Sequence, residues 1–431
     1  MLVIAIPALF ILAILVYYLP PVHSRLSWRV DEMILRVRYA LNPPEAAIFI
    51  PAQSTVLPAP MVYTVTPAFD PGISKPTASP TQPGPTETPL PTSIPTQIAT
   101  PLPGQVALKG VRYEDQHGRF NYCAPANLAM ALSYWGWDGD RDVVGPLLKP
   151  DPKDKNVMPY EMVDYVQGNT DLRAIERVGG DLELIKRFLA AGFPVLVEKG
   201  TYLTDLTGVK SWMGHYEVIT GYSDPQGHFI AQDSFVGPDF EVAYDVMEKG
   251  WRAFNHTYLI IYPPEKEAQA LALLGPDADA QTNYQRAAQK ASDEIFALEG
   301  IDKYFAWFNR GTNLRLLQDF AGAAEAYDQA FQVYPAIPEA ERPWRMLWYQ
   351  TGPYFAYFYA GRYWDVLNLA DATLNNMQSE KNIEETYYWR GMAKAALGDT
   401  AGASEDYQTA LKYHPGFVPA IYQLEQLGIS P

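Results

Sequence analysis

Residues 121–127 read Asn-Tyr-Cys-Ala-Pro-Ala-Asn and contain Cys123, the only cysteine in a chain of 431 residues. Apolar residues then recur at helical spacing from Leu128 to Trp135, and Gly136 follows. Pro125 agrees with this pattern, because a proline in the first helical turn loses no hydrogen bond. The stretch therefore predicts a buried helix that begins near Cys123 and carries the thiol at its N-terminal end.

A thiol in this position has a chemical consequence. Only the thiolate attacks a carbonyl, and the unpaired N–H groups and positive dipole end of a helix N-terminus favour the thiolate. A base is also needed. His215 opens a strand-like run that continues to Tyr222, and a turn at 223–227 leads to a second run that ends at Asp233. Two antiparallel strands joined there would place His215 beside Asp233, which could orient the imidazole.

Three other residues bear on this hypothesis. Gln116, seven residues before Cys123, is the amide that could donate to an oxyanion. His117 and His256 compete with His215 as the base, but His117 is next to Gln116 in a loop and His256 begins the apolar strand 257–262. The alternative interpretation is structural, because a lone cysteine on an apolar helix is most often a small buried hydrophobe.

The order Gln116, Cys123-Ala124-Pro125, Gly214-His215-Tyr216 and Asp233 resembles the papain-like cysteine peptidases of the bacteriocin-processing, double-glycine-cleaving type. The resemblance spans about Val111 to Pro263. It implies Cys123 as the nucleophile, His215 as the base, Asp233 as its orienting carboxylate and Gln116 as the oxyanion donor, with no metal or cofactor. Two positions depart from the family pattern: Ala124 stands where a glycine is usual, and Ser234 stands where a proline usually follows the aspartate.

Composition limits the partners. The formal net charge of −16 argues against nucleic acid, which attracts basic faces. The sequence contains no paired Cys/His spacing for zinc and no glycine-rich nucleotide loop. Residues 1–19 carry no charged side chain and are about long enough to cross a bilayer. The segment 51–104 is dominated by Pro and Thr and cannot bury a core, which predicts an extended tether.

A repeat predicts the fold of the last region. Six positions recur with the same spacing, which resembles the tetratricopeptide pattern: Gly311, Leu314, Ala323, Tyr327, Ala330 and Pro335 match Gly391, Lys394, Ala403, Tyr407, Ala410 and Pro415. Small residues let paired helices approach, tyrosine fills the gap to the next pair, and proline ends the second helix. Such arrays present a concave surface to a protein partner.

We therefore expect a multidomain chain. Its parts are a membrane helix at 1–20, a juxtamembrane segment at 21–50, a disordered Pro/Thr-rich linker at 51–104, an α+β papain-like domain at 105–263 with its N-terminal helix packed on an antiparallel sheet, and all-α tetratricopeptide-type repeats at 264–431. The expected activity is cleavage of peptide bonds in a peptide or protein substrate, with the repeats recruiting that substrate or a partner.

Several consequences follow from this interpretation. The tether favours a single-pass protein of the cell membrane with extracytoplasmic catalytic and repeat domains, although Arg25, Arg29, Arg36 and Arg38 just after the span favour the opposite orientation. Deletion of 268–431 is expected to spare cleavage of short peptides. Two alternatives stay open: an inactive papain-like scaffold that binds peptides, and a thiol acyltransferase or amidase that acts on other substrates.

Overall fold

The computed structural model of the chain describes residues 49–51, 101–204 and 210–431, together with short stretches between residues 14 and 41. The predicted membrane helix at 1–20 and the predicted linker at 51–104 lie largely outside the described residues, so both stay predictions. Within the part of the chain that is described, no helix combines the length and the apolar character that crossing a bilayer requires.

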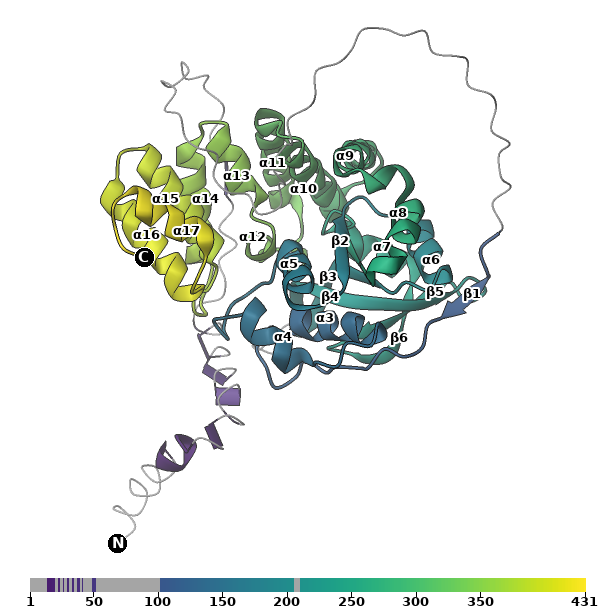
Figure 1. Cartoon of the computed structure of the whole chain (residues 1–431). Helices are drawn as coiled ribbons and strands as arrows, with labels where there is room; N and C mark the ends of the chain where they lie inside the picture. The colour runs from purple at the N-terminus through teal and green to yellow at the C-terminus, as the bar shows by residue number, and fades with distance from the viewer. Residues whose placement is uncertain are drawn as a thin grey trace, which may run out of the picture.

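The first region is built on one antiparallel sheet (Figure 1). Its strands run in the order β2-β7-β3-β4-β5-β6, and β1 pairs with β4 outside this path. The strand bounds are β1 Gln105–Ala107, β2 Arg173–Arg177, β3 Val195–Thr204, β4 Lys210–Ser223, β5 His228–Asp233, β6 Gly237–Ala243 and β7 Tyr258–Tyr262.

Helices cover both faces of this sheet. They are α3 Cys123–Tyr134, α4 Arg141–Leu148, α5 Pro159–Asn169, α6 Leu182–Ala190, α7 Tyr244–Arg252 and α8 Glu267–Leu274. Residues along a strand alternate between the two cores. Leu196 of β3 packs with α3, whereas its neighbours Val195 and Val197 pack with α6 and α7. This period of two explains why residues 195–197 of β3 form an unbroken apolar run, because each of them enters one core or the other.

The second region is helical, as the sequence predicted. It contains α9 Ala280–Ala297, α10 Gly300–Leu316, α11 Phe320–Val333, α12 Met346–Tyr349, α13 Gly352–Tyr359, α14 Tyr363–Asn375, α15 Glu384–Ala396, α16 Thr400–Tyr413 and α17 Val418–Gln426. Single 3₁₀ turns lie at Pro264–Lys266, Gly275–Ala278, Tyr334–Ala336 and Glu339–Glu341.

The recurring residues occupy matching places in two helix pairs, α10 with α11 and α15 with α16. A Cβ on Gly311 would come within 2.8 Å of the Tyr327 ring, and one on Gly391 within 2.7 Å of the Tyr407 ring. Glycine is therefore the residue that lets each tyrosine pack against the preceding helix. The geometry is that of stacked helical hairpins, and the tetratricopeptide assignment stays a prediction.

The two regions share one hydrophobic core. Trp212 of β4 and Phe254, which follows α7, belong to the same buried cluster as Phe305 of α10 and Tyr349 of α12. The rings of Trp212 and Phe254 stack with centroids 5.7 Å apart, and Phe305 and Tyr349 lie 6.0 and 5.9 Å from Trp212. Figure 1 shows α12 between the sheet and the later helix pairs. The helical region is thus packed against the sheet rather than held apart from it.

Candidate active site

Cys123 is the first residue of α3, as predicted, and its side chain is half-buried. The turn that precedes it contains Asn121 in a left-handed conformation, with φ of 46°. Asparagine tolerates this region better than most residues. The Lys149 ammonium donates to the carbonyl oxygens of Phe120 and Asn121 at 2.6 and 3.0 Å, and so holds this turn. No side chain caps the helix, so its first N–H groups stay available near the thiol.

Ala124 fits the helix without difficulty. It is almost fully buried and packs in the core between α3 and the sheet. A methyl group in a right-handed helical residue carries no conformational penalty, unlike one in a left-handed turn. The departure from glycine at this position therefore does not distort the turn that presents Cys123.

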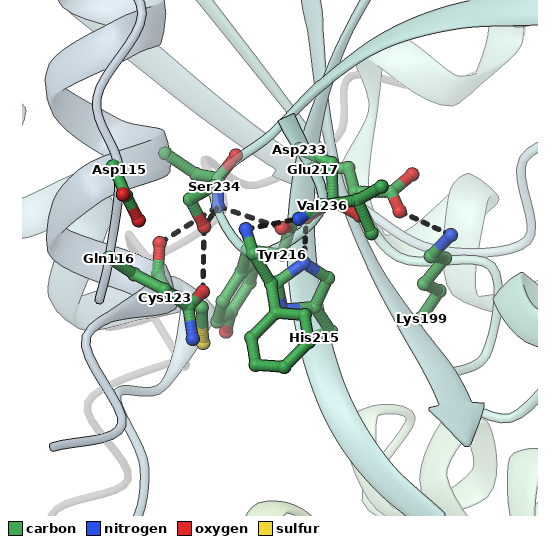
Figure 2. Close-up of polar contacts among 12 residues, drawn as sticks. Asp115, Gln116, Cys123, Lys199, His215, Tyr216, Glu217, Asp233, Ser234 and Val236 are labelled. Atoms are coloured by element: carbon green, nitrogen blue, oxygen red, sulfur yellow. Dashed lines mark hydrogen bonds and ion pairs between the residues drawn. The ribbon is translucent and has the colours of Figure 1, made fainter. Parts of the chain in front are cut away.

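His215 and Asp233 lie side by side on neighbouring strands, β4 and β5 (Figure 2). The imidazole Nε2 is 2.9 Å from Oδ1 of Asp233, and both side chains are buried. Backbone N–H groups of Phe235 and Val236 donate to the same oxygen at 2.7 and 3.0 Å. These bonds fix the carboxylate, and the carboxylate in turn fixes the imidazole so that its other nitrogen, Nδ1, is available to the thiol.

The charges of this group favour a thiolate–imidazolium pair. Burial works to raise the pKa of Cys123, but the hydrogen bond and the positive charge of His215 outweigh it, and the thiol pKa is lowered. Burial works to lower the pKa of His215, but the Asp233 carboxylate and the thiolate raise it to about 10. Burial would likewise raise the pKa of Asp233, yet the imidazolium lowers it well below its usual range. These shifts favour a thiolate next to an imidazolium that is itself paired with a carboxylate.

Gln116 is held by a chain of side-chain hydrogen bonds. The Ser234 hydroxyl donates to Oε1 of Gln116 at 2.8 Å, and Nδ2 of Asn127 donates to the Ser234 oxygen at 2.8 Å. The Gln116 backbone N–H also donates to the Ser234 carbonyl at 2.9 Å. Because Oε1 accepts from Ser234, the amide NH₂ group of Gln116 is left for the cleft that it shares with Cys123.

The sequence analysis did not foresee Asn127, Ser234 or Lys149. Asn127 is fully buried in an otherwise apolar stretch of α3, one turn after Cys123, and an amide in such a stretch is the signal that could have found it. Ser234 was noted only as a departure from proline. Its hydroxyl links Asn127 to Gln116, a connection that a proline could not make. No sequence pattern marked Lys149, because its contact with the turn before Cys123 depends on how the loop after α4 folds, and the residues around Lys149 do not predict that.

The competing histidines have other partners. His117 Nδ1 is 2.6 Å from Oδ1 of Asp115 in an exposed loop at the rim of the cleft. His256 is buried and its Nε2 is 3.0 Å from Oε1 of Glu248. Of the three histidines considered, His215 is the one whose hydrogen bond and charge act on Cys123.

Three clusters in the described part of the chain bring ligand atoms of histidine and carboxylates within 4.8 Å of one another, as a metal site would: His215 with Glu217 and Asp233; Asp154 with Glu384 and His414; and Glu248 with His256 and Glu294. In the first cluster Lys199 already forms an ion pair with Glu217, and His215 holds Asp233. A cation there would have to displace these charges. The catalytic chemistry of a thiolate requires no metal.

The cleft above Cys123 has a volume of about 890 Å³, and both regions of the chain line it. The helical region contributes Arg345, Trp348, Tyr349, Ser379 and Glu380. Tyr349 fits because residue 214 is a glycine: a Cβ there would come within 2.9 Å of the Tyr349 ring and 2.7 Å of the Phe254 ring. Arg345 Nη1 donates to Oγ of Ser211 at 2.6 Å and to the Trp212 carbonyl at 3.1 Å, which holds this wall on β4.

A thiol and a carboxylate on either side of one imidazole, at the edge of a cleft, are the arrangement that thiol hydrolases use. Residues 108–262 match the model of the Peptidase_C39 like family. This match confirms the resemblance inferred from the residues and, at the level of the family, supports a cysteine peptidase.

No curated protein matches the chain. Among solved structures, the chain is similar to a crystal structure described as that of a C39-like peptidase from Bacillus anthracis. The two are 18% identical, the match covers 36% of this chain and 96% of the other, and the TM-score is 0.30.

Proposed function

We propose that the chain is a thiol peptidase that cleaves peptide bonds with Cys123, His215 and Asp233. The observation that supports this most directly is the 2.9 Å contact between His215 and Asp233 in a cleft where His215 lowers the pKa of the only thiol. A carbonyl carbon placed over the thiolate would meet a nucleophile that is already ionised, so no separate deprotonation step is needed.

The reaction follows from the positions of these groups. The Cys123 sulfur attacks the scissile carbonyl carbon, and the resulting oxyanion accepts from the Gln116 amide and the Cys123 backbone N–H. The His215 imidazolium gives its proton to the leaving amine, which departs and leaves a thioester. The neutral imidazole then takes a proton from water, the hydroxide attacks the thioester, and the carboxylic acid product leaves with regeneration of the ion pair.

Internally quenched peptides, including some with a Gly-Gly pair, test this proposal. We expect hydrolysis at one bond, identified by mass spectrometry, and its loss in Cys123→Ala and His215→Gln. His117→Gln is the matched control, because the sequence left His117 open as the base. Labelling of Cys123 by iodoacetamide without hydrolysis of any peptide would indicate a peptide-binding scaffold. Turnover of small amides alone would indicate an amidase.

The helical region and residues 1–20 bear on the binding partners and the cellular location of the chain. We propose that the helical region, which shares the cleft with the peptidase domain, engages the peptide substrate or a partner protein. Anchoring by residues 1–20 and an extracytoplasmic position stay predictions from the sequence. Fractionation of cells that express the full chain, followed by protease protection of intact cells, tests both.

A further inference from the structure

Two buried lysines line the cleft next to the nucleophile. Lys149 follows α4 and Lys155 lies in the loop before α5, and each is only 3% exposed. Both line the cavity that contains Cys123. They lie around the Phe120 ring, with Nζ of Lys149 5.8 Å and Nζ of Lys155 4.6 Å from its centroid.

Both ammonium groups lack a carboxylate partner within ion-pair distance among the described residues. Lys149 donates to two backbone carbonyls, and Lys155 donates to the carbonyl of Lys153 at 3.3 Å. The other buried lysines differ. Lys199 forms an ion pair with Glu217, and Nζ of Lys186 lies 3.0 Å from Glu183 and 2.8 Å from Asp224. Buried charges in proteins are normally paired, so two lysines without a carboxylate partner at a cavity indicate a place where an anion could bind.

Burial disfavours the charged form of both lysines. The pKa of Lys149 is lowered to about 8, mainly by burial, and that of Lys155 is lowered to about 7, by burial first and then by the positive charge of Lys149. The negative charges of Asp154, Cys123 and Asp151 offset this in part at Lys149, and those of Asp154 and Glu380 do so at Lys155. The pKa of Asp154 is itself raised well above its usual range, mainly by burial. A carboxylate that entered the cleft could add a negative charge at ion-pair distance from these ammonium groups.

Basic side chains outnumber acidic ones along the cleft when the two lysines are included. The described lining residues include six basic residues and three acidic ones: Arg38, Arg119, Lys149, Lys153, Lys155 and Arg345 against Asp142, Glu198 and Glu380. Two of the acids are already paired, Asp142 with Arg119 and Glu380 with Lys153. In a chain of net charge −16, this local excess of positive charge would attract an acidic substrate to the cleft and repel a basic one.

We propose that Lys149 and Lys155 form an anion subsite beside Cys123 that binds a carboxylate of the peptide substrate. That carboxylate belongs either to an Asp or Glu side chain near the scissile bond or to the C-terminus of the peptide. The subsite rests on the proposed peptidase function, because it places the scissile bond of an acidic peptide over the thiolate.

Matched peptides test the subsite. A sequence that the chain cleaves is taken from an internally quenched library, and each position near the cut is made Glu in one peptide and Gln in its partner, all with amidated C-termini. A second pair differs only in a free or amidated C-terminus. We expect kcat/KM to favour one carboxylate-bearing peptide by about tenfold or more, the usual effect of a charged hydrogen bond. The pair that shows the preference identifies the source of the carboxylate.

Variants then assign the preference to the lysines. Lys155→Met should reduce the preference to below about threefold, and Lys155→Arg should retain most of it. Lys249→Met is the control, since Lys249 is exposed on α7, outside the cleft, and the substitution changes the net charge equally. If Lys155→Met fails to fold, inhibition of the wild-type chain by the acetylated acidic product, compared with its Gln or amide counterpart, measures the same preference.

The outcomes separate this inference from the proposed function. If the wild-type chain cleaves no peptide, the peptidase proposal fails. If it cleaves peptides but treats the matched pairs alike, or if Lys155→Met keeps the full preference for the carboxylate, the anion subsite is refuted while the peptidase proposal stands.

Discussion

Replacement of Asp233 by asparagine is the most informative perturbation of the candidate site. The substitution keeps the size and shape of the side chain but removes a negative charge 2.9 Å from Nε2 of His215. We expect the chain to fold and the thiolate–imidazolium pair to be lost at neutral pH. The rate at which iodoacetamide alkylates Cys123 should then fall, because only the thiolate reacts.

The magnitude follows from the distance. Unit charges 2.9 Å apart attract by about 6 kcal/mol at an effective dielectric constant of about 20. That attraction changes the proton affinity of the imidazole about 10⁴-fold. Removal of the carboxylate should therefore move the pKa of His215 from about 10 to roughly 6 or below. A thiol without its imidazolium has a pKa of about 8.5 or more, so about 1% is ionised at pH 6.5. At this pH alkylation should slow by up to about 100-fold, the limit reached if the wild-type thiol is fully ionised.

Two groups set the pH dependence of the wild-type chain, the Cys123 thiol on the acid side and the His215 imidazolium on the alkaline side. The thiolate is lost as pH falls through the lowered pKa of Cys123, so alkylation should persist well below pH 8.5. The imidazolium is lost as pH rises through about 10, so peptide hydrolysis, which needs that proton for the leaving amine, should decline there. In Asp233→Asn the alkaline decline should move toward pH 6.

The assay is alkylation of Cys123 between pH 4 and 11, quantified by mass spectrometry of the single cysteine peptide. Asp239→Asn is the matched control, because Asp239 lies on the neighbouring strand β6 and accepts from Gln232 rather than from His215. Circular dichroism checks the fold of both variants. An Asp233→Asn chain that folds and keeps the wild-type pH profile would refute the electrostatic argument for the ion pair.

Three further predictions follow. Ser234→Ala should lower kcat/KM about fivefold, the effect of one lost hydrogen bond, and Gln116→Ala should lower it about 100-fold. The double variant should have the same kcat/KM as Gln116→Ala. Additive effects of the two substitutions would show that the serine acts by another route. Gly214→Ala should lower the free energy of unfolding by about 1–3 kcal/mol in a guanidinium titration because its Cβ meets two aromatic rings, while Gly168→Ala, which meets nothing within 4 Å, should have no such effect. Deletion of 268–431 should abolish cleavage even of short peptides, contrary to the expectation from the sequence, because it removes one wall of the cleft and also α8, which packs in a core of the sheet. Retained activity in the truncated chain would show that both are dispensable.

The sequence was sufficient for the features that depend on local pattern. A helix that begins at Cys123 follows from the apolar period and the proline in its first turn. The pairing of β4 with β5 follows from two apolar runs around a short turn, and this pairing brings His215 to Asp233. The glycine and tyrosine pairs of the helical region could be predicted for the same reason, since each depends on the spacing of a single helix pair.

What the sequence did not determine depends on contacts between distant segments. Ser234 links Asn127 to Gln116, and it orients the Gln116 amide although the two residues are 118 positions apart in the sequence. Lys149 and Lys155 meet at Phe120 only because the loop after α4 folds back on the turn before α3. The sequence predicted the helical repeats as a separate module. In the structure Trp212 and Tyr349 pack in one core, and the helical region forms a wall of the cleft. Periodicity records which face of an element is buried, but not which element buries it, and that choice is made by the tertiary packing alone.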